Sequence, residues 1–100
     1  MKLGMLVNTD RHLDDVKGIV NAALSKGHEV TLFTMGEGTR LLENPEYIGI
    51  CKLKGVSMAF CDHNATGFGV DKSAITEEVV CGSQYNNSVM DHESDRVIVL

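Results

Sequence analysis

Residues 56–64 carry the sequence Val-Ser-Met-Ala-Phe-Cys-Asp-His-Asn, in which an apolar run ends at Cys61 and a polar stretch follows at once. The run is typical of a buried strand, and the polar stretch suits the start of a helix. Cys61 would then lie at the carboxyl end of a strand, where open α/β sheets bind ligands. The start of a helix favours the thiolate form of Cys61. The negative charge of Asp62 would oppose the thiolate, whereas a protonated His63 would favour it. The stretch therefore predicts an α/β fold with a candidate reactive thiol.

Other β-rich runs lie before and after this one. Together the five runs cover Lys2–Val7, Glu29–Met35, Val56–Cys61, Glu78–Cys81 and Arg96–Leu100. Most are continuous apolar runs, as expected for parallel strands that are covered on both faces. Helical patterns fill the gaps between them. This alternation predicts a three-layer α/β sandwich, in which a mainly parallel sheet of about five strands lies between helices on both faces.

The clearest helical pattern follows the first strand. Apolar residues recur at helical spacing from Leu13 to Leu24, and Gly27 is a good stop. Further helical segments are predicted at residues 39–43, from 45 to about 54, from just past 61 to 67–69, and at 83–94. The last of these contains Asn86 and Asn87, which have poor helix propensity. No helix follows the closing strand, so either this strand lies centrally in the sheet or a partner subunit protects it.

Length and composition limit the function classes. The 100 residues predict one domain over residues 1–100, and the formal charge of −5 argues against a nucleic-acid partner. Only Lys2 precedes the first short apolar run, which fits neither a signal peptide nor a membrane span, so we expect a cytoplasmic protein without a membrane partner. Three cysteines without CxxC spacing do not form a secreted disulfide framework.

Several polar residues follow strands and are expected to ring one cleft at the carboxyl edge of the sheet. Cys61 would be the nucleophile there, with Asn8, Thr9 and Ser83 as hydrogen-bond donors around it and His63 as a candidate proton carrier. The alternative is that Cys61 is a small buried hydrophobe at the end of a strand.

The two other cysteines have different expected roles. Cys51 falls on the apolar face of the third helical segment and is predicted to be structural. Cys81 ends the fourth strand and is a candidate resolving thiol for a disulfide with Cys61. Cys61, His63, Cys81 and His92 supply four potential metal ligands, but their spacing is not a zinc pattern, so no metal site is predicted.

Several features follow one another along the whole chain. They are the opening strand Leu3–Val7, the join Gly27-His28-Glu29-Val30, Cys61 at a strand's end, a short segment to 69–70, a brief strand at Val79-Val80, a helix and the closing Asp95-Arg96-Val97-Ile98-Val99-Leu100. In the order of these features the chain resembles the DsrE/DsrF-like family, which includes the sulfur-relay Tus subunits.

This resemblance implies a five-stranded parallel α/β sandwich that assembles as a homo-oligomer, a trimer or a hexamer. It also implies that Cys61 accepts sulfur as a persulfide and passes it to the thiol of another protein. Such a carrier needs donor and acceptor proteins and no bound cofactor.

Two other functions fit the same residues. One is a non-enzymatic oligomeric module whose cleft holds a small ligand or a metal, with Cys61 merely structural; an inert, buried Cys61 would favour it. The other is a thiol redox sensor, in which peroxide produces a disulfide between Cys61 and Cys81.

Overall fold

The structure, a computed structural model, describes residues 1–100 and is built on a five-stranded sheet in which every pair of neighbouring strands is parallel. The strands are β1 (Lys2–Val7), β2 (Glu29–Thr34), β3 (Val56–Cys61), β4 (Val79–Gly82) and β5 (Arg96–Val99). Their order across the sheet is β4-β3-β2-β1-β5. The predicted fold class is confirmed, and each predicted strand end lies within one residue of the observed one.

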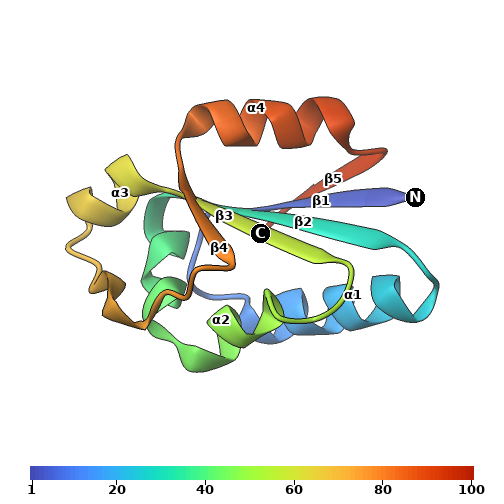
Figure 1. Cartoon of the computed structure of the whole chain (residues 1–100), viewed down its shortest axis with the longest axis horizontal. Helices are drawn as coiled ribbons and strands as arrows, with labels where there is room; N and C mark the ends of the chain where they lie inside the picture. The colour runs from blue at the N-terminus through green and yellow to red at the C-terminus, as the bar shows by residue number, and fades with distance from the viewer.

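Helices cover the two faces of the sheet unequally (Figure 1). One face carries α1 (Leu13–Ser25), the 3₁₀ helix η1 (Gly36–Glu43) and α2 (Pro45–Ile50). The opposite face carries only α4 (Gln84–Glu93), which lies over β1 and β2. The short helices α3 (Asp62–Gly67) and η2 (Lys72–Ala74) connect β3 to β4. No helix of the chain has the length and apolar character that crossing a bilayer requires.

The third helical segment ends earlier than predicted. The sequence pattern predicts a helix that reaches about Lys54, but α2 stops at Ile50. The next three N–H groups, from Cys51 to Leu53, bond to carbonyls only three residues back, which tightens the chain into turns. Gly55 then adopts a positive φ of 93°, a conformation that favours glycine, and the chain enters β3.

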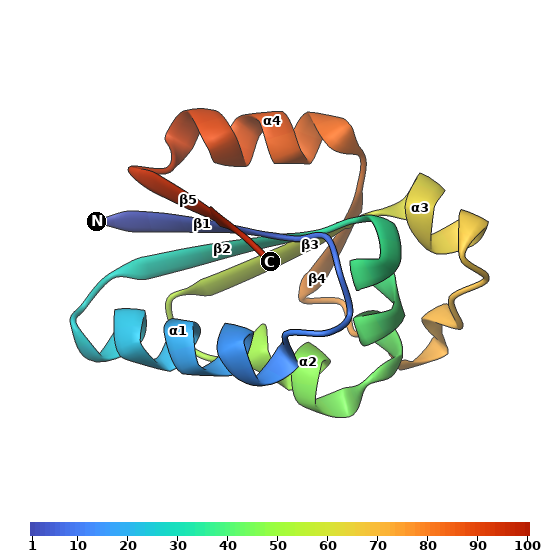
Figure 2. The ribbon, with the colours of Figure 1, turned by 180° about the vertical axis from the view of Figure 1, so that it is seen from behind.

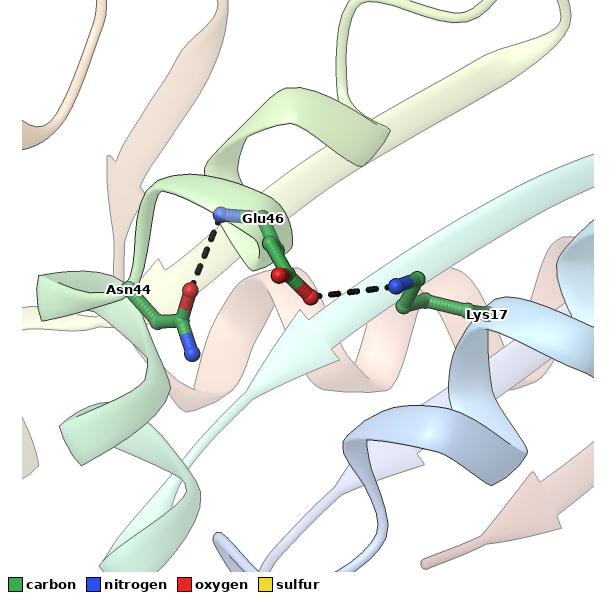
Figure 3. Close-up of polar contacts among 3 residues, drawn as sticks. All are labelled: Lys17, Asn44 and Glu46. Carbon is green, nitrogen blue, oxygen red and sulfur yellow. Dashed lines mark hydrogen bonds and ion pairs between the residues drawn. The ribbon is translucent and has the colours of Figure 1, made fainter.

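Helices α2 and α4 each start at a residue whose side chain caps the helix. Asn44 Oδ1 accepts from the backbone N–H of Glu46 at 2.9 Å and so caps α2, while Lys17 Nζ donates to the Glu46 carboxylate at 3.0 Å (Figure 3). Helix α4 begins with a capping box: Ser83 Oγ accepts from a first-turn N–H, and Asn86 Oδ1 accepts from the Ser83 N–H at 2.9 Å. This box stabilises a helix whose residues have poor propensity.

The strands divide their buried side chains between two cores. On β3, Met58 and Phe60 enter the larger core beneath α1 and α2. Cys61 points to the other face, as expected for successive strand residues, and joins a small cluster with Phe33 and Met90. The face beneath α4 therefore has the smaller core.

Strand β5 is an edge strand, paired only with β1 (Figure 2). Of the two predicted arrangements, a central position in the sheet is therefore wrong. Register with Gly4 and Leu6 places Val97 and Val99 on the α4 face, where they are 40% and 61% exposed. An edge of this kind leaves both backbone groups and apolar side chains without cover.

Candidate functional site

Cys61 is the last residue of β3 and the N-cap residue of α3. Its place between a strand and a helix is the one predicted. The side chain is nevertheless only 2% exposed, because Phe33 and Met90 form a cluster with it and Leu6, Met35 and Ala59 pack against that cluster. The thiol is therefore positioned at a helix start but covered from solvent.

The other residues predicted for the carboxyl edge are not among the side chains that cover Cys61. The N–H groups of Asn8 and Thr9 donate to the Leu100 carbonyl at 2.8 and 3.1 Å, and the Thr9 hydroxyl is buried without a partner. Ser83 Oγ caps α4, and His63 is exposed on α3. No cavity of the structure is lined by Cys61, His63, Asn8, Thr9 or Ser83. The expected shared cleft is therefore absent.

The carboxyl edge is instead closed by contacts between loops. Asn64, on α3, accepts a hydrogen bond from the Gly36 N–H at 2.9 Å. Gly36 has a positive φ of 55° and lies so close to Asn8 that a Cβ there would be 2.6 Å from the amide oxygen. Sequence reasoning missed Asn64, because nothing in a polar helix start tells which distant backbone group it will bind.

Cys81 and Cys61 lie on opposite faces of the sheet. The register of β3 with β4 pairs Cys81 with Phe60 and Gly82 with Cys61, and register partners point to the same face. Cys81 is exposed, and all three cysteines are free thiols. An internal Cys61–Cys81 disulfide would therefore require one of these strands to change its register.

Asp62 forms an ion pair with Lys72. Lys72 Nζ donates to the Asp62 carboxylate at 2.5 Å and to Thr66 Oγ1 at 3.0 Å. The hydrogen bond from Lys72 lowers the pKa of Asp62 below its ordinary value. Desolvation, followed by the Asp62 charge, raises the pKa of Cys81. The acidic neighbour of Cys61 is thus paired with Lys72, and its negative charge acts on Cys81.

Cys51 occupies the position expected of a structural cysteine. It is buried in the larger core, and its Sγ lies 3.9 Å from Thr76 Oγ1. Of the side chains considered as metal ligands, His63 and His92 are exposed on α3 and α4. Nowhere do three or more His, Cys, Asp or Glu side chains gather closely enough to hold a metal ion.

The largest cavity is a groove of 460 Å³ between α4 and strands β1 to β3. Its floor includes Thr31, Ser57 and Ala59, and its α4 wall includes Asn86 and Met90. The groove exists because small side chains form the floor and because α4 alone covers this face. Sequence reasoning placed the candidate cleft at the carboxyl edge of the sheet, whereas the concave surface lies along its α4 face.

Solved structures share this fold. The YchN protein from E. coli matches with a TM-score of 0.77 and 12% identity over 100% of both chains. A protein of unknown function from Methanobacterium thermoautotrophicum matches with a TM-score of 0.70 and 17% identity, over 99% of this chain and 98% of that chain. A conserved protein of unknown function from Bacteroides thetaiotaomicron matches with a TM-score of 0.74 and 16% identity, over 99% of this chain and 94% of that chain. These likenesses show the fold alone. No protein family model and no curated protein matches the sequence.

Proposed function

We propose that the protein is a persulfide carrier that holds sulfur on Cys61. The observation that carries this proposal is the pairing of Asp62 with Lys72, because an unpaired carboxylate would oppose anionic sulfur on the preceding residue. No side chain caps the first turn of α3, so its N–H groups remain available to stabilise a negative charge at the N-cap position. The resemblance to sulfur-relay proteins supports the same activity.

Loading and transfer are thiol exchanges without net oxidation. The Cys61 thiolate attacks the outer sulfur of a donor persulfide, a new sulfur–sulfur bond forms, and the donor's own bond breaks. The donor leaves as a thiolate and takes up the proton that Cys61 lost. An acceptor protein's thiolate then attacks the outer sulfur on Cys61 in the same way, and Cys61 is released as the thiolate. The cycle needs donor and acceptor thiols and no cofactor.

Replacing Cys61 with serine is expected to abolish sulfur loading. Reduced protein incubated with cysteine persulfide should gain one sulfur atom in intact-mass spectra, and peptide mapping should place it on Cys61. Serine has nearly the same size as cysteine but forms no persulfide. The amount of added sulfur in the Cys61→Ser protein should therefore fall to the background level.

Cys51→Ser and Cys81→Ser are the matched controls, since they remove a buried and an exposed thiol. Both should keep the adduct on Cys61. Sulfur found on Cys81 in the wild type, with Cys61 unmodified, would overturn the assignment of the carrier residue.

A second candidate function, a small-ligand binding module, is favoured by the burial of Cys61 and by the groove along α4. A groove of 460 Å³ lies within the size range of small-molecule sites, roughly 300–1,000 Å³. In this case Cys61 is a packing residue, and a Cys61→Ala protein would fold and bind its ligand as the wild type does. The loading experiment separates the two functions, because a binding module acquires no sulfur on Cys61.

We also propose that the chain forms a homo-oligomer through β5. The support is the uncovered edge, which presents Val97 and Val99 on the same face. The resemblance implies a trimer or a hexamer. A second subunit that covers β5 would remove its apolar side chains from water and satisfy its free backbone groups.

Placing a charge on this edge is expected to reduce the assembly to monomers. Val99→Lys puts an ammonium where the partner would bury an apolar side chain. Sedimentation velocity should show a multiple of 10.9 kDa for the wild type and 10.9 kDa for the variant. The control is Leu53→Lys, which charges an exposed apolar residue that follows α2 and should leave the assembly intact. A monomeric wild type at micromolar concentration would contradict the proposal.

A further inference from the structure

The groove along α4 leads toward the buried sulfur. Ser57 and Ala59 form part of its floor, and Cys61 is the next residue on the same face of β3. Alternate residues of a strand are separated by roughly 6–7 Å. The floor of the groove therefore stops at Ala59, two residues before Cys61 along β3. The Cys61 side chain itself is covered.

The first turn of α4 lies at this end of the groove. Asn86 is a groove residue, and its side-chain carbon Cγ lies 2.6 Å from where a Cβ on Gly82 would be. Gly82 is the register partner of Cys61, so the Asn86 amide packs over the backbone beside Cys61. The same turn also contacts Met35, through a hydrogen bond from Gln84 Nε2 to its sulfur at 3.8 Å, and Met35 packs on the cluster that contains Cys61.

A capping box holds this turn in place. Asn86 Oδ1 accepts from the Ser83 N–H at 2.9 Å, and Ser83 Oγ accepts from the Tyr85 N–H at 3.2 Å. Tyr85 is exposed, and Met90 is the one buried residue of α4. Helix ends fray with a small free energy, and this end has few apolar contacts to oppose fraying. When the box breaks, the Asn86 side chain is free to leave Gly82.

We propose that the groove along α4 is the route by which a low-molecular-weight persulfide reaches Cys61, and that α4, from its capped first turn to Met90, which packs on Cys61, is the lid over the sulfur. The inference rests on the proposed carrier function and assigns its donor class. The groove has room for a small molecule and not for a folded donor domain. Thr31 and Ser57, which are register partners, place two hydroxyls on the floor for the polar part of the donor.

The transfer step through the open lid is balanced. The Cys61 thiolate attacks the outer sulfur of the donor R–S–SH, the donor's sulfur–sulfur bond breaks, and a bond from Cys61 to that sulfur forms. R–S⁻ leaves along the groove and accepts the proton released by Cys61. When the lid closes again, the persulfide is covered by Met90 of the same helix.

Weakening the lid is expected to raise the reactivity of Cys61. Iodoacetamide modification of the native protein is followed by peptide mass, which separates Cys61 from the exposed Cys81. Ser83→Ala removes the side-chain cap of α4 and should speed the modification of Cys61 about five-fold. Loss of one N-cap bond shifts the equilibrium between the closed and the open first turn by about this factor. Gly82→Ala, whose methyl displaces Asn86, should act in the same direction.

Asn44→Ala is the matched control, because it removes a comparable cap from α2 on the opposite face of the sheet (Figure 3). It should leave the rate at Cys61 unchanged. Equal acceleration in Ser83→Ala and Asn44→Ala would mean that Cys61 reacts through unfolding of the whole domain. That result would overturn the lid.

Filling the groove tests the route by a second variant. Ser57 is exposed, so Ser57→Phe should fold while its ring occupies the floor, and loading by cysteine persulfide should fall at least ten-fold. Ser25→Phe, on α1, is the control. Normal loading in Ser57→Phe would overturn the route and leave the carrier function standing. Rapid alkylation of Cys61 in Ser83→Ala without any sulfur loading would overturn the carrier function and leave the lid standing.

Discussion

Replacing Gly38 with alanine is expected to destabilise the fold by about 3 kcal/mol, one of the largest effects of any single methyl group in this chain. Gly38 lies in η1, where its backbone crosses the end of β1. A Cβ at this position would overlap the Val7 carbonyl, and it would lie 2.9 Å from the Val7 carbonyl carbon. Both neighbours are backbone atoms of a buried strand, so neither can rotate away.

The clash also breaks the contacts that dock η1 on the sheet. The Gly38 N–H donates to the Met35 carbonyl at 3.0 Å and approaches the Asn8 carbonyl at 3.3 Å. Moving Gly38 away from Val7 loosens these bonds and lifts η1, which buries Leu41 and Leu42 in the larger core. The midpoint of urea unfolding should therefore fall, with no change in the slope of the transition.

Gly49→Ala is the matched control for this experiment. Gly49 lies inside α2, and no atom is within 4 Å of the position that a Cβ would take. Alanine there should stabilise the protein by roughly 0.5–1 kcal/mol, because it restricts the unfolded chain and favours the helix. If both variants unfold at the wild-type midpoint, then η1 does not pack on β1 as described.

The fold was predictable because most strands are continuous apolar runs separated by helical patterns. Register was not, because a shift of one residue moves a side chain to the other face of the sheet. Pairing of Cys81 with Phe60, rather than with Cys61, separates two thiols that lie at the carboxyl ends of neighbouring strands, within one residue of each end. Strand order was equally hidden, and it decides that β5 lies at an edge.

The candidate site was predictable only in part. The position of Cys61 at the end of a strand follows from local sequence, whereas its cover depends on where α4 lies. The partner of Asp62 is Lys72, ten residues away, and no local pattern identifies it. The groove arises from Ser57 and Ala59 on a face that a single helix covers, which is a property of the layers and not of a motif.

Tyr47→Phe is expected to destabilise the protein at neutral pH and to make it less sensitive to alkali. Tyr47 is fully buried in the larger core, and its hydroxyl is hydrogen-bonded to Thr34 Oγ1 at 2.5 Å. Phenylalanine keeps the ring but leaves the buried Thr34 hydroxyl without a partner, which costs about 1–3 kcal/mol. Urea unfolding at pH 7 measures this loss.

Alkaline pH should shrink and then remove this difference. Burial raises the pKa of Tyr47 well above its ordinary value of 10.0, so the folded protein keeps a proton that the unfolded chain releases. The stabilisation from this group is complete below pH 10 and falls as the pH rises toward the folded pKa, by about 1.4 kcal/mol per pH unit. Tyr47→Phe lacks this dependence on pH, so the unfolding free energies of wild type and variant should meet between about pH 11 and 12.

The control is Thr34→Val, which should keep the wild-type slope of unfolding free energy against pH, because burial of Tyr47 is the larger cause of the raised pKa. Equal slopes for wild type and Tyr47→Phe would mean that the hydroxyl reaches water, and the packing of α2 against β2 would then have to be looser than the structure has it.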